Sequence, residues 1–201
     1  LPIPGVEVKL GESNALLIRG PNVMMGYWNN PAATAAIISS DGWLNSGDIA
    51  SIDAQGHVTI TGRLKEIIVL STGEKIPPAD MEAAILRDPL FEQAMLIGEA
   101  RSYLSVMVVL NAAHWQNVVS QYGLDASLNT DQQRQQVEEI LLDKITEQTS
   151  EFPGYAKIRR VALIQEPWNV ENGLLTPTLK LKRAKVLEKY VREVERLYAG
   201  H

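Results

Sequence analysis

Three polar segments of this sequence hold residue types that can bind a nucleotide or stabilise charge on a phosphate. In the first, a glycine precedes Asp48, so the backbone can approach closely and the carboxylate can accept hydrogen bonds from a sugar diol. In the second, Arg63 offers a planar guanidinium group to a phosphate or ribose oxygen, and Lys65 adds a positive charge. In the third, Pro177 stiffens the backbone ahead of Lys180, whose ammonium group can stabilise charge that develops on a phosphate.

Each segment also has a purely structural interpretation. Asp48 fits a solvated β-turn, Arg63 fits a linker that makes surface ion pairs, and Lys180 fits the basic entry to a helix. Each chemical signal is weak when it is taken alone, because Gly-Asp pairs and surface ion pairs are common in proteins. The order of the segments along the chain must therefore decide between the interpretations.

Short strands separated by turn formers are expected to position the first of these segments. Runs rich in β-branched residues predict strands at 6–10, 15–18, 43–52 and 57–61. Glycine, asparagine and aspartate between the runs supply turns, and Pro31 opens a short helix expected at 32–38. The pattern predicts a small β-rich unit.

Beyond Gly62 the pattern changes to alternating helices and strands, which predicts an α+β unit. Asn111 can cap a helix that Gly123 closes. Further helices are expected between Pro77 and Asp88, at 131–148 and at 184–198, with strands at 93–97, 104–110 and 158–164. The candidate boundary between the two units is 61–65, where a glycine followed by charged residues can act as a pivot.

The composition is that of an ordinary globular protein, and it excludes several classes of site. Of the 201 residues, 45% are hydrophobic and 21% are charged, which allows a substantial core. The absence of cysteine removes disulfides, thiolate catalysis and cysteine-ligated metal. The net charge of −5 argues against a nucleic-acid partner, and no apolar run is long enough to span a bilayer. The chain starts at Leu1 without methionine, as if cut from a longer protein, and no secretory signal is recognisable.

Six motifs in register resemble the C-terminal region of the adenylate-forming enzymes. They lie at 43–48, 53–56, 62–65, 71–75, 78–82 and 176–183, and the resemblance covers nearly the whole chain. This superfamily comprises acyl-CoA synthetases, adenylation domains of nonribosomal peptide synthetases, and luciferases. Other members usually have Ser/Thr-Gly-Lys at the last motif. The long-chain acyl-CoA synthetases are similar to this chain both there, at Thr178-Leu179-Lys180, and upstream at Phe152-Pro153-Gly154-Tyr155.

The resemblance implies an α+β fold of two parts. Residues 1–62 would be a small β-rich, distorted barrel-like subdomain, the last of the large AMP-binding domain. Residues 63–201 would be a mobile α+β C-terminal domain of the acyl-CoA synthetase/luciferase type.

The resemblance also implies a long-chain fatty acid–CoA ligase, which forms acyl-AMP from ATP and then a thioester with CoA. This chain alone would not be catalytic. Two alternatives within the enzyme class stay open, a medium-chain acyl-CoA ligase and a nonribosomal peptide synthetase adenylation domain. A non-catalytic binding or regulatory module is the alternative from another class.

Individual residues receive roles from the same resemblance. Asp48 would bind the ribose hydroxyls, Arg63 would contact ribose or phosphate oxygens, and Lys65 would be the hinge. Lys180 would be the catalytic residue that reaches the α-phosphate and the carboxylate during adenylation. Lys182 is a neighbour that could share this role.

A second group of residues is implied to serve CoA. Thr72, Gly73 and Glu74 match the loop of the pantetheine channel, where a glycine leaves room for a narrow thiol arm. Lys75 would help an anionic group of CoA or lie at the surface. Glu82, on the helix that follows, is interpreted as structural.

The implied substrates are a fatty acid, ATP and CoA, with Mg²⁺ bound outside this chain and no metal site within it. The implied partner is the N-terminal AMP-binding region of the same polypeptide, which is missing here. No nucleic acid is expected. The expected location is the cytoplasm, and a peripheral contact with a membrane stays open.

Overall fold

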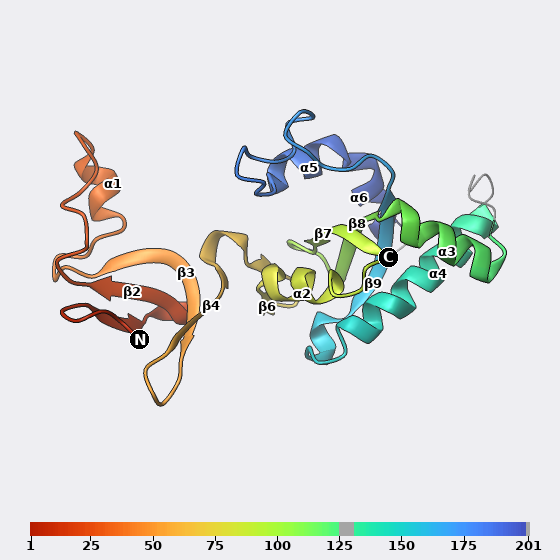
Figure 1. Cartoon of the computed structure of the whole chain (residues 1–201). Helices are drawn as coiled ribbons and strands as arrows, with labels where there is room; N and C mark the ends of the chain where they lie inside the picture. Colours follow the sequence, from red (N-terminus) through yellow and green to blue (C-terminus); the bar gives the residue numbers. More distant parts are fainter. Residues whose placement is uncertain (125–130, 200–201) are drawn as a thin grey trace. The chain divides into compact units, whose positions relative to one another are not determined.

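The chain folds into two compact units that adjoin in the sequence at Ile67 and Ile68. The computed structural model describes residues 1–124 and 131–199, and the units are Leu1–Ile67 and Ile68–His201. Figure 1 shows the first unit in red to gold and the second in yellow to blue. Each unit has its own sheet and its own core, so each is described by itself.

The first unit is built on one antiparallel sheet in which strands that follow one another in the chain also lie side by side. The strands pair in the order β1–β2–β3–β4. They are β1 (Glu7–Leu10), β2 (Ala15–Arg19), β3 (Leu44–Ile52) and β4 (Val58–Arg63), accompanied by the single-turn helices η1 (Glu12–Asn14) and η2 (Leu64–Glu66). The four strands expected from the sequence are confirmed to within two residues.

The helix of the first unit is shorter than the sequence predicts. Helix α1 covers Pro31–Ala35, and the side chain of Asn30 caps its start. The expected helix ran on to Ile38, but Ile38 forms a β-bridge with Leu44 at the beginning of β3. Pairing with the sheet therefore ends the helix early.

The second unit contains a three-stranded sheet with helices around it. The sheet has the order β7–β8–β9, in which β7 and β8 are antiparallel and β8 and β9 are parallel. Its strands are β7 (Phe91–Ile97), β8 (Leu104–Leu110) and β9 (Ile158–Ile164). The helices are α2 (Pro78–Ile85), α3 (Ala112–Tyr122), α4 (Asp131–Gln148), the single turn η3 (Gly154–Ala156), α5 (Arg183–Lys189) and α6 (Val191–Tyr198). The predicted α+β fold is confirmed.

Strand β8 is buried on both faces of this sheet. Leu104, Val106 and Val108 belong to one apolar cluster and Met107 and Val109 to another, and none of the five is more than 2% exposed. Alternate residues of a strand point to opposite faces, so a strand with apolar residues on both faces requires cover on both. The core of the second unit therefore has two layers, one on each face of the sheet.

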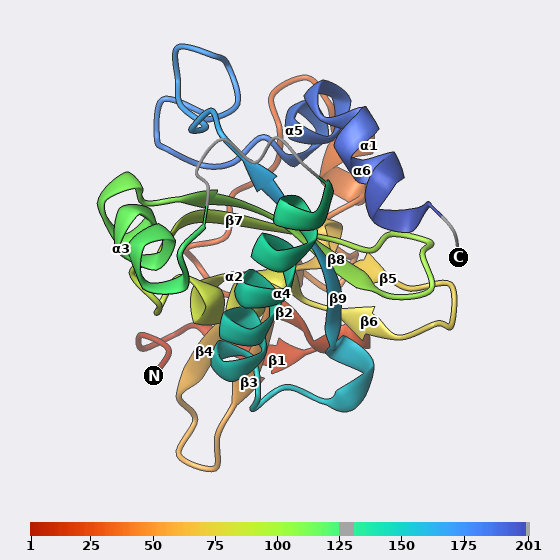
Figure 2. The same ribbon diagram turned by 90° about the vertical axis from the view of Figure 1, so that its right-hand side faces the viewer.

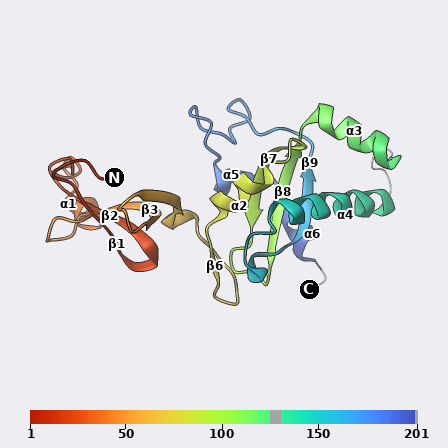
Figure 3. The same cartoon turned by 60° about the horizontal axis from the view of Figure 1, so that its bottom comes forward.

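Helices supply the cover. We call the face with Val106 the first face; α2 and α4 pack on it through Met81, Ile85, Val137, Leu141 and Ile145. The face with Met107 is the second face, and Val186 of α5 and Leu197 of α6 pack on it together with Trp168 and Leu174. Figure 2 shows α4 crossing in front of the sheet, and Figure 3 shows α3 and α4, which connect β8 with β9.

The segment 184–198 is helical as expected, but it forms two helices, α5 and α6, instead of one. The helical backbone is interrupted at Tyr190, where φ is −108° and ψ is 31°. Val186 before the break is 0% exposed and Leu197 after it is 3% exposed, so both helices bury an apolar residue on the second face. Packing on the sheet overrides a sequence pattern that continues through the break.

Other helix limits follow the sequence closely. The Asn111 side chain accepts hydrogen bonds from two backbone N–H groups at the start of α3, and Gly123 ends the helix with a φ of 61°, which confirms both caps. The bounds of α4 are those expected. Within residues 1–124 and 131–199, no helix combines the length and apolarity needed to cross a membrane.

Because α4 covers one face of the sheet, shortening one of its buried side chains should lower the free energy of unfolding. Leu141 is 1% exposed on the first face, and replacing it with alanine should lower the free energy of unfolding by about 2–5 kcal/mol. Urea unfolding followed by circular dichroism measures the change. Glu139→Ala, at an exposed position of the same helix, is the control and should shift the midpoint little. Equal midpoints for the two variants would show that Leu141 does not support the core.

Candidate functional site

The adjacent strands β3 and β4 bring two separate polar segments of the sequence together. Asp48 and Arg63 are direct cross-strand neighbours, and the Arg63 Nε lies 2.8 Å from the Asp48 Oδ1. The Asp48 side chain is 22% exposed and that of Arg63 is 54% exposed. The sequence singled out both residues but gave no sign that they form an ion pair.

A bulge in β3 sets the position of Asp48. The strand is irregular opposite Leu16, and Gly47 has a φ of 76°, which a residue with a side chain rarely adopts. The Ser46 hydroxyl donates to the Leu16 carbonyl at 3.1 Å and accepts from the Asp48 N–H at 3.1 Å. The backbone on both sides of the glycine is therefore held in place before any ligand arrives.

The pair retains hydrogen-bonding capacity. A carboxylate has about four acceptor positions and a guanidinium has five N–H groups, so one contact uses a small part of either. Asp48 can accept from vicinal hydroxyls, and Arg63 can donate to ribose or phosphate oxygens.

Lys65 lies at the end of the first unit. It is exposed in the single-turn helix η2, directly after β4 and two residues before the division at Ile67. The backbone is extended on both sides of this turn, at Arg63 and at Ile67. Its role as a hinge stays a prediction.

The segment expected to serve CoA forms a small hairpin. Strands β5 (Ile68–Val69) and β6 (Lys75–Ile76) pair antiparallel, and the Leu70 N–H donates to the Glu74 carbonyl at 3.0 Å. The Thr72 hydroxyl donates to the Glu74 carboxylate, and this bond lowers the pKa of Glu74 below its usual value. An anionic acceptor is thus held at the turn. Lys75 follows it and is exposed.

Gly73 at the tip of the hairpin is explained by its backbone angle. Its φ is 95°, and a Cβ added to it would meet no atom within 4 Å. The sequence interpretation attributed this glycine to a lack of space beside a thiol arm. Within the described residues the space is open, so the turn itself already requires glycine.

Lys180 is displayed at the end of a tight loop. The Thr176 N–H donates to the Lys180 carbonyl at 2.8 Å, and the Lys180 N–H donates to the Thr176 hydroxyl oxygen at 3.0 Å. Leu179 between them has a φ of 60°. Lys180 is exposed, whereas Lys182 is partly buried at the start of α5. The bonded turn gives Lys180 a defined position.

The predicted site residues therefore fall into two groups. Asp48 contacts Arg63 in the first unit, and Thr72 contacts Glu74 in the second, which also carries Lys180. Among the described residues, no group of three or more His, Asp or Glu side chains is arranged to hold a metal ion.

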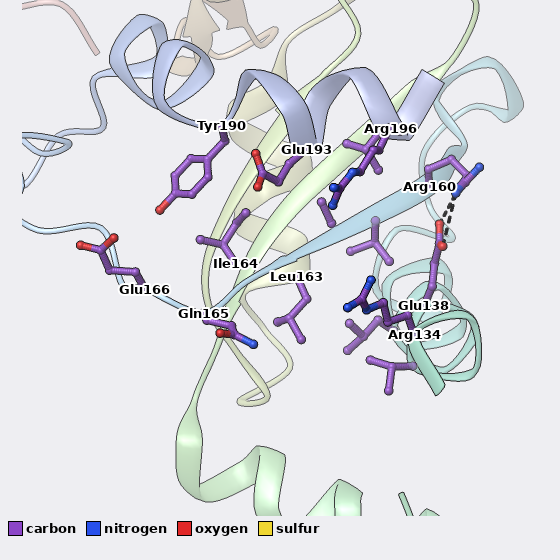
Figure 4. Close-up of a pocket in the computed structure, with 15 residues that line it drawn as sticks. Arg134, Glu138, Arg160, Leu163, Ile164, Gln165, Glu166, Tyr190, Glu193 and Arg196 are labelled. Carbon is purple, nitrogen blue, oxygen red and sulfur yellow. Dashed lines mark hydrogen bonds and ion pairs between the residues drawn. The ribbon is translucent and has the colours of Figure 1, made fainter. Parts of the chain in front are cut away.

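A groove that the sequence did not reveal runs beside β9. Its volume is about 860 Å³, and it is bordered by β9, α4 and α6 (Figure 4). The Arg160 Nε lies 2.6 Å from the Glu138 Oε1, and this bond raises the pKa of Arg160. None of the predicted site residues lines the groove.

Comparison with known proteins finds one matching family model and relatives that match nearly the whole chain. Residues 65–201 match the family model described as AMP-binding enzyme C-terminal domain. The chain is 33% identical to "Probable acyl-activating enzyme 16, chloroplastic" of Arabidopsis thaliana, over 96% of this chain and 28% of that protein. It is 31% identical to the long-chain-fatty-acid–CoA ligase FadD15 of Mycobacterium tuberculosis, over 98% of this chain and 33% of that protein.

A solved structure is also similar to nearly the whole chain. The adenylation domain of a carboxylate reductase from Mycobacterium chelonae has a TM-score of 0.80 and 27% identity, covering 98% of this chain and 31% of that one. This chain thus spans about a third of the length of the proteins that it matches.

The geometry of Gly73 predicts that a side chain is costly there for conformational reasons. Gly73→Ala should lower the free energy of unfolding by about 1–3 kcal/mol, because alanine is strained at positive φ. It should also speed amide exchange at residue 73, whose N–H donates to the Leu70 carbonyl at 2.9 Å. Gly154→Ala is the matched control, since its added Cβ also meets no atom within 4 Å but its φ is not positive. If both variants behave alike, backbone strain is not the reason for Gly73.

Proposed function

This chain belongs to the family of AMP-binding enzyme C-terminal domains, and from that premise we propose that it is the C-terminal part of an ATP-dependent long-chain fatty acid–CoA ligase. The complete enzyme would make acyl-AMP and pyrophosphate from the acid and ATP, and would then transfer the acyl group to the thiol of CoA. The observation that carries the proposal is that similarity to long-chain fatty acid–CoA ligases extends over both units, although the family model begins at residue 65.

In the first half-reaction, Asp48 and Arg63 bind the nucleotide. The Asp48 carboxylate accepts from the ribose hydroxyls, and the half-exposed Arg63 donates to ribose or phosphate oxygens. Their 2.8 Å contact keeps both groups oriented before the nucleotide binds. Such preorganisation reduces the entropy lost on binding.

Lys180 acts electrostatically in the same half-reaction. Its ammonium group lies near the α-phosphate and the acyl carboxylate and stabilises the negative charge that develops there. Removal of one such group costs enzymes about 2.7–4 kcal/mol of transition-state stabilisation. The hydrogen-bonded turn from Thr176 to Lys180 supports this role, because a fixed cation needs little reorganisation during the reaction.

In the second half-reaction, the hairpin with Thr72, Gly73 and Glu74 lies beside the pantetheine arm of CoA, and Lys75 assists an anionic group of CoA. The second unit turns about Lys65 between the two half-reactions. This hinge is supported by the compactness of the two units and by the position of Lys65 next to their division.

The proposal assigns ATP, CoA and a fatty acid as substrates, with Mg²⁺ held by the preceding region of the polypeptide. Exposed apolar side chains on the first unit support the proposal that the preceding region of the polypeptide packs against it. Met25 is 104% exposed and Trp28 is 98% exposed. We also propose a cytoplasmic enzyme, which the cysteine-free sequence permits. A peripheral membrane contact would let it collect its lipid substrate.

A second candidate is an adenylation domain that passes its acyl group to another acceptor. The carboxylate reductase domain with a TM-score of 0.80 favours this alternative. The complete protein should be incubated with palmitate, ATP and CoA, and acyl-AMP and acyl-CoA should be measured by mass spectrometry. Formation of acyl-CoA supports the ligase. Formation of acyl-AMP without acyl-CoA supports the alternative, and formation of neither supports a non-catalytic module.

Replacement of Lys180 should separate the half-reactions. In the complete enzyme, Lys180→Ala is expected to slow acyl-AMP formation by about 100- to 1,000-fold, because the cation at the developing phosphate charge is lost. Conversion of supplied acyl-AMP and CoA to acyl-CoA should continue at a rate near that of the wild type. Lys185→Ala, an exposed lysine of α5, controls for loss of positive charge. Equal loss in both half-reactions would refute the assignment.

Restriction of the hinge should uncouple the two steps. Lys65→Pro fixes φ at about −65° and disfavours helical geometry at Leu64, so it restricts the torsion changes that rotation requires. Each half-reaction measured alone is expected to change less than the overall conversion of acid to acyl-CoA. Lys65→Ala keeps the backbone free and is the control. Wild-type kinetics for Lys65→Pro in all three assays would place the hinge elsewhere.

A further inference from the structure

Two side chains from opposite faces of the second unit meet at the free edge of β7. The Arg183 Nη1, at the start of α5, lies 2.6 Å from the Glu82 Oε1 of α2. The side chains are 21% and 16% exposed, so most of each is removed from water. Helix α2 packs on the first face and α5 on the second, and the ion pair therefore ties the two layers together.

Both residues also bind the backbone of β7. The Leu96 N–H donates to the Glu82 carboxylate at 2.7 Å, and the Leu96 carbonyl accepts from the Arg183 Nη2 at 2.5 Å. Strand β7 is at the end of the sheet order, so Leu96 has no neighbouring strand on that side among the described residues. The Glu82–Arg183 pair thus satisfies polar groups at a sheet edge and fixes its own position against that edge.

We call the Glu82–Arg183 pair the clamp, and the segment 174–182 the Lys180 loop. The clamp residue Arg183 follows directly after this loop. The loop closes at its base, where the Lys182 N–H donates to the Leu174 carbonyl at 2.9 Å and Leu175 forms a β-bridge with Leu181. Arg183 is the next residue, so its bonds hold the base of the loop against β7. Leu174 is 3% exposed on the second face and anchors the other end.

The backbone of Leu179 shows why the loop needs such an anchor. Its φ of 60° is unfavourable for a residue with a side chain and persists only where surrounding contacts determine it. The side chain of Leu179 is 72% exposed and supplies little packing of its own. The restraint must come from the bonds within the loop and from its base.

We propose that Arg183 and Glu82 are positioning residues for Lys180, and that they hold its ammonium group where adenylation requires it. This inference rests on the proposed role of Lys180 in acyl-AMP formation. Neither residue touches the substrates, and both act through the loop that ends at Arg183. A displacement of about 1 Å in a catalytic group can cost about 100-fold in rate.

The β5–β6 hairpin, which is proposed to serve CoA, is held by hydrogen bonds that do not involve the clamp. The Ser71 N–H donates to the Arg101 carbonyl at 2.9 Å, and the Ala100 N–H donates to the Val69 carbonyl at 2.8 Å. The Val69 N–H donates to the Glu99 carboxylate at 2.9 Å. Weakening the clamp should therefore loosen the Lys180 loop and leave the hairpin in place.

Arg183→Lys in the complete enzyme is the first test. Lysine keeps the charge, but a single ammonium group cannot reproduce the planar fork that reaches both Glu82 and the Leu96 carbonyl. Acyl-AMP formation should fall by about 10- to 100-fold, chiefly in kcat. Conversion of supplied acyl-AMP with CoA should stay within about twofold of the wild type. The control is Lys185→Ala, which changes neither rate.

Glu82→Gln provides a second variant in case Arg183→Lys folds poorly. Its amide oxygen can still accept from the Leu96 N–H, while the charge partner of Arg183 is lost. The same split between half-reactions is expected. If either folded variant keeps wild-type adenylation, or loses both half-reactions equally, the positioning role is overturned.

Amide exchange tests the clamp without reference to activity. The Leu179 and Lys180 N–H groups, which donate within the loop to Thr176, should exchange faster in Arg183→Lys, while amides of β8 should be unchanged. Unchanged loop exchange would contradict the proposal. Lys180→Ala, measured in parallel, tests the proposed role of Lys180 by itself. If acyl-AMP formation survives that change, the role of Lys180 is wrong, whether or not the loop exchanges faster in Arg183→Lys.

Discussion

Burial of β8 on both faces is the constraint on which the second unit depends. Leu104, Val106 and Val108 need cover on one face, and Met107 and Val109 need it on the other. Helix α2 covers the first face and follows directly after the β5–β6 hairpin. Helix α5 covers the second face and follows directly after the Lys180 loop. The two segments assigned to different half-reactions are therefore carried by the two layers of a single core.

Patterns of residues close together in the sequence were sufficient to predict most of the helices and strands. The strand expected at 104–110, the helix expected at 131–148 and the caps Asn111 and Gly123 were each predicted from residues close together in the sequence, and each is confirmed. The break at Tyr190 was missed because an apolar stripe runs through it and only packing on the sheet interrupts it. The strands of the β5–β6 hairpin are two residues each, too short to show a period.

The site shows the same division between local and distant information. Asp48 and Arg63 could be chosen from their chemistry and from the order of the motifs, but their contact depends on the register of β3 against β4. Glu82 and Arg183 are 101 residues apart in the chain, and nothing near either one indicates the other. Residue identities were thus accessible from the sequence, whereas pairings that arise from tertiary packing were not.

The parallel pairing of β8 with β9 governs the order in which the second unit can assemble. Antiparallel β7 and β8 are neighbours in the chain, but β9 joins them only after α3 and α4 have been made. Closing so long a connection is slow, because chain entropy is lost before the new contacts form. During synthesis, the Met107 side of the β7–β8 ribbon is only partly covered until Trp168, Val186 and Leu197 have all been made. That interval is when a nascent chain is most exposed to aggregation, and when a chaperone would be of most use.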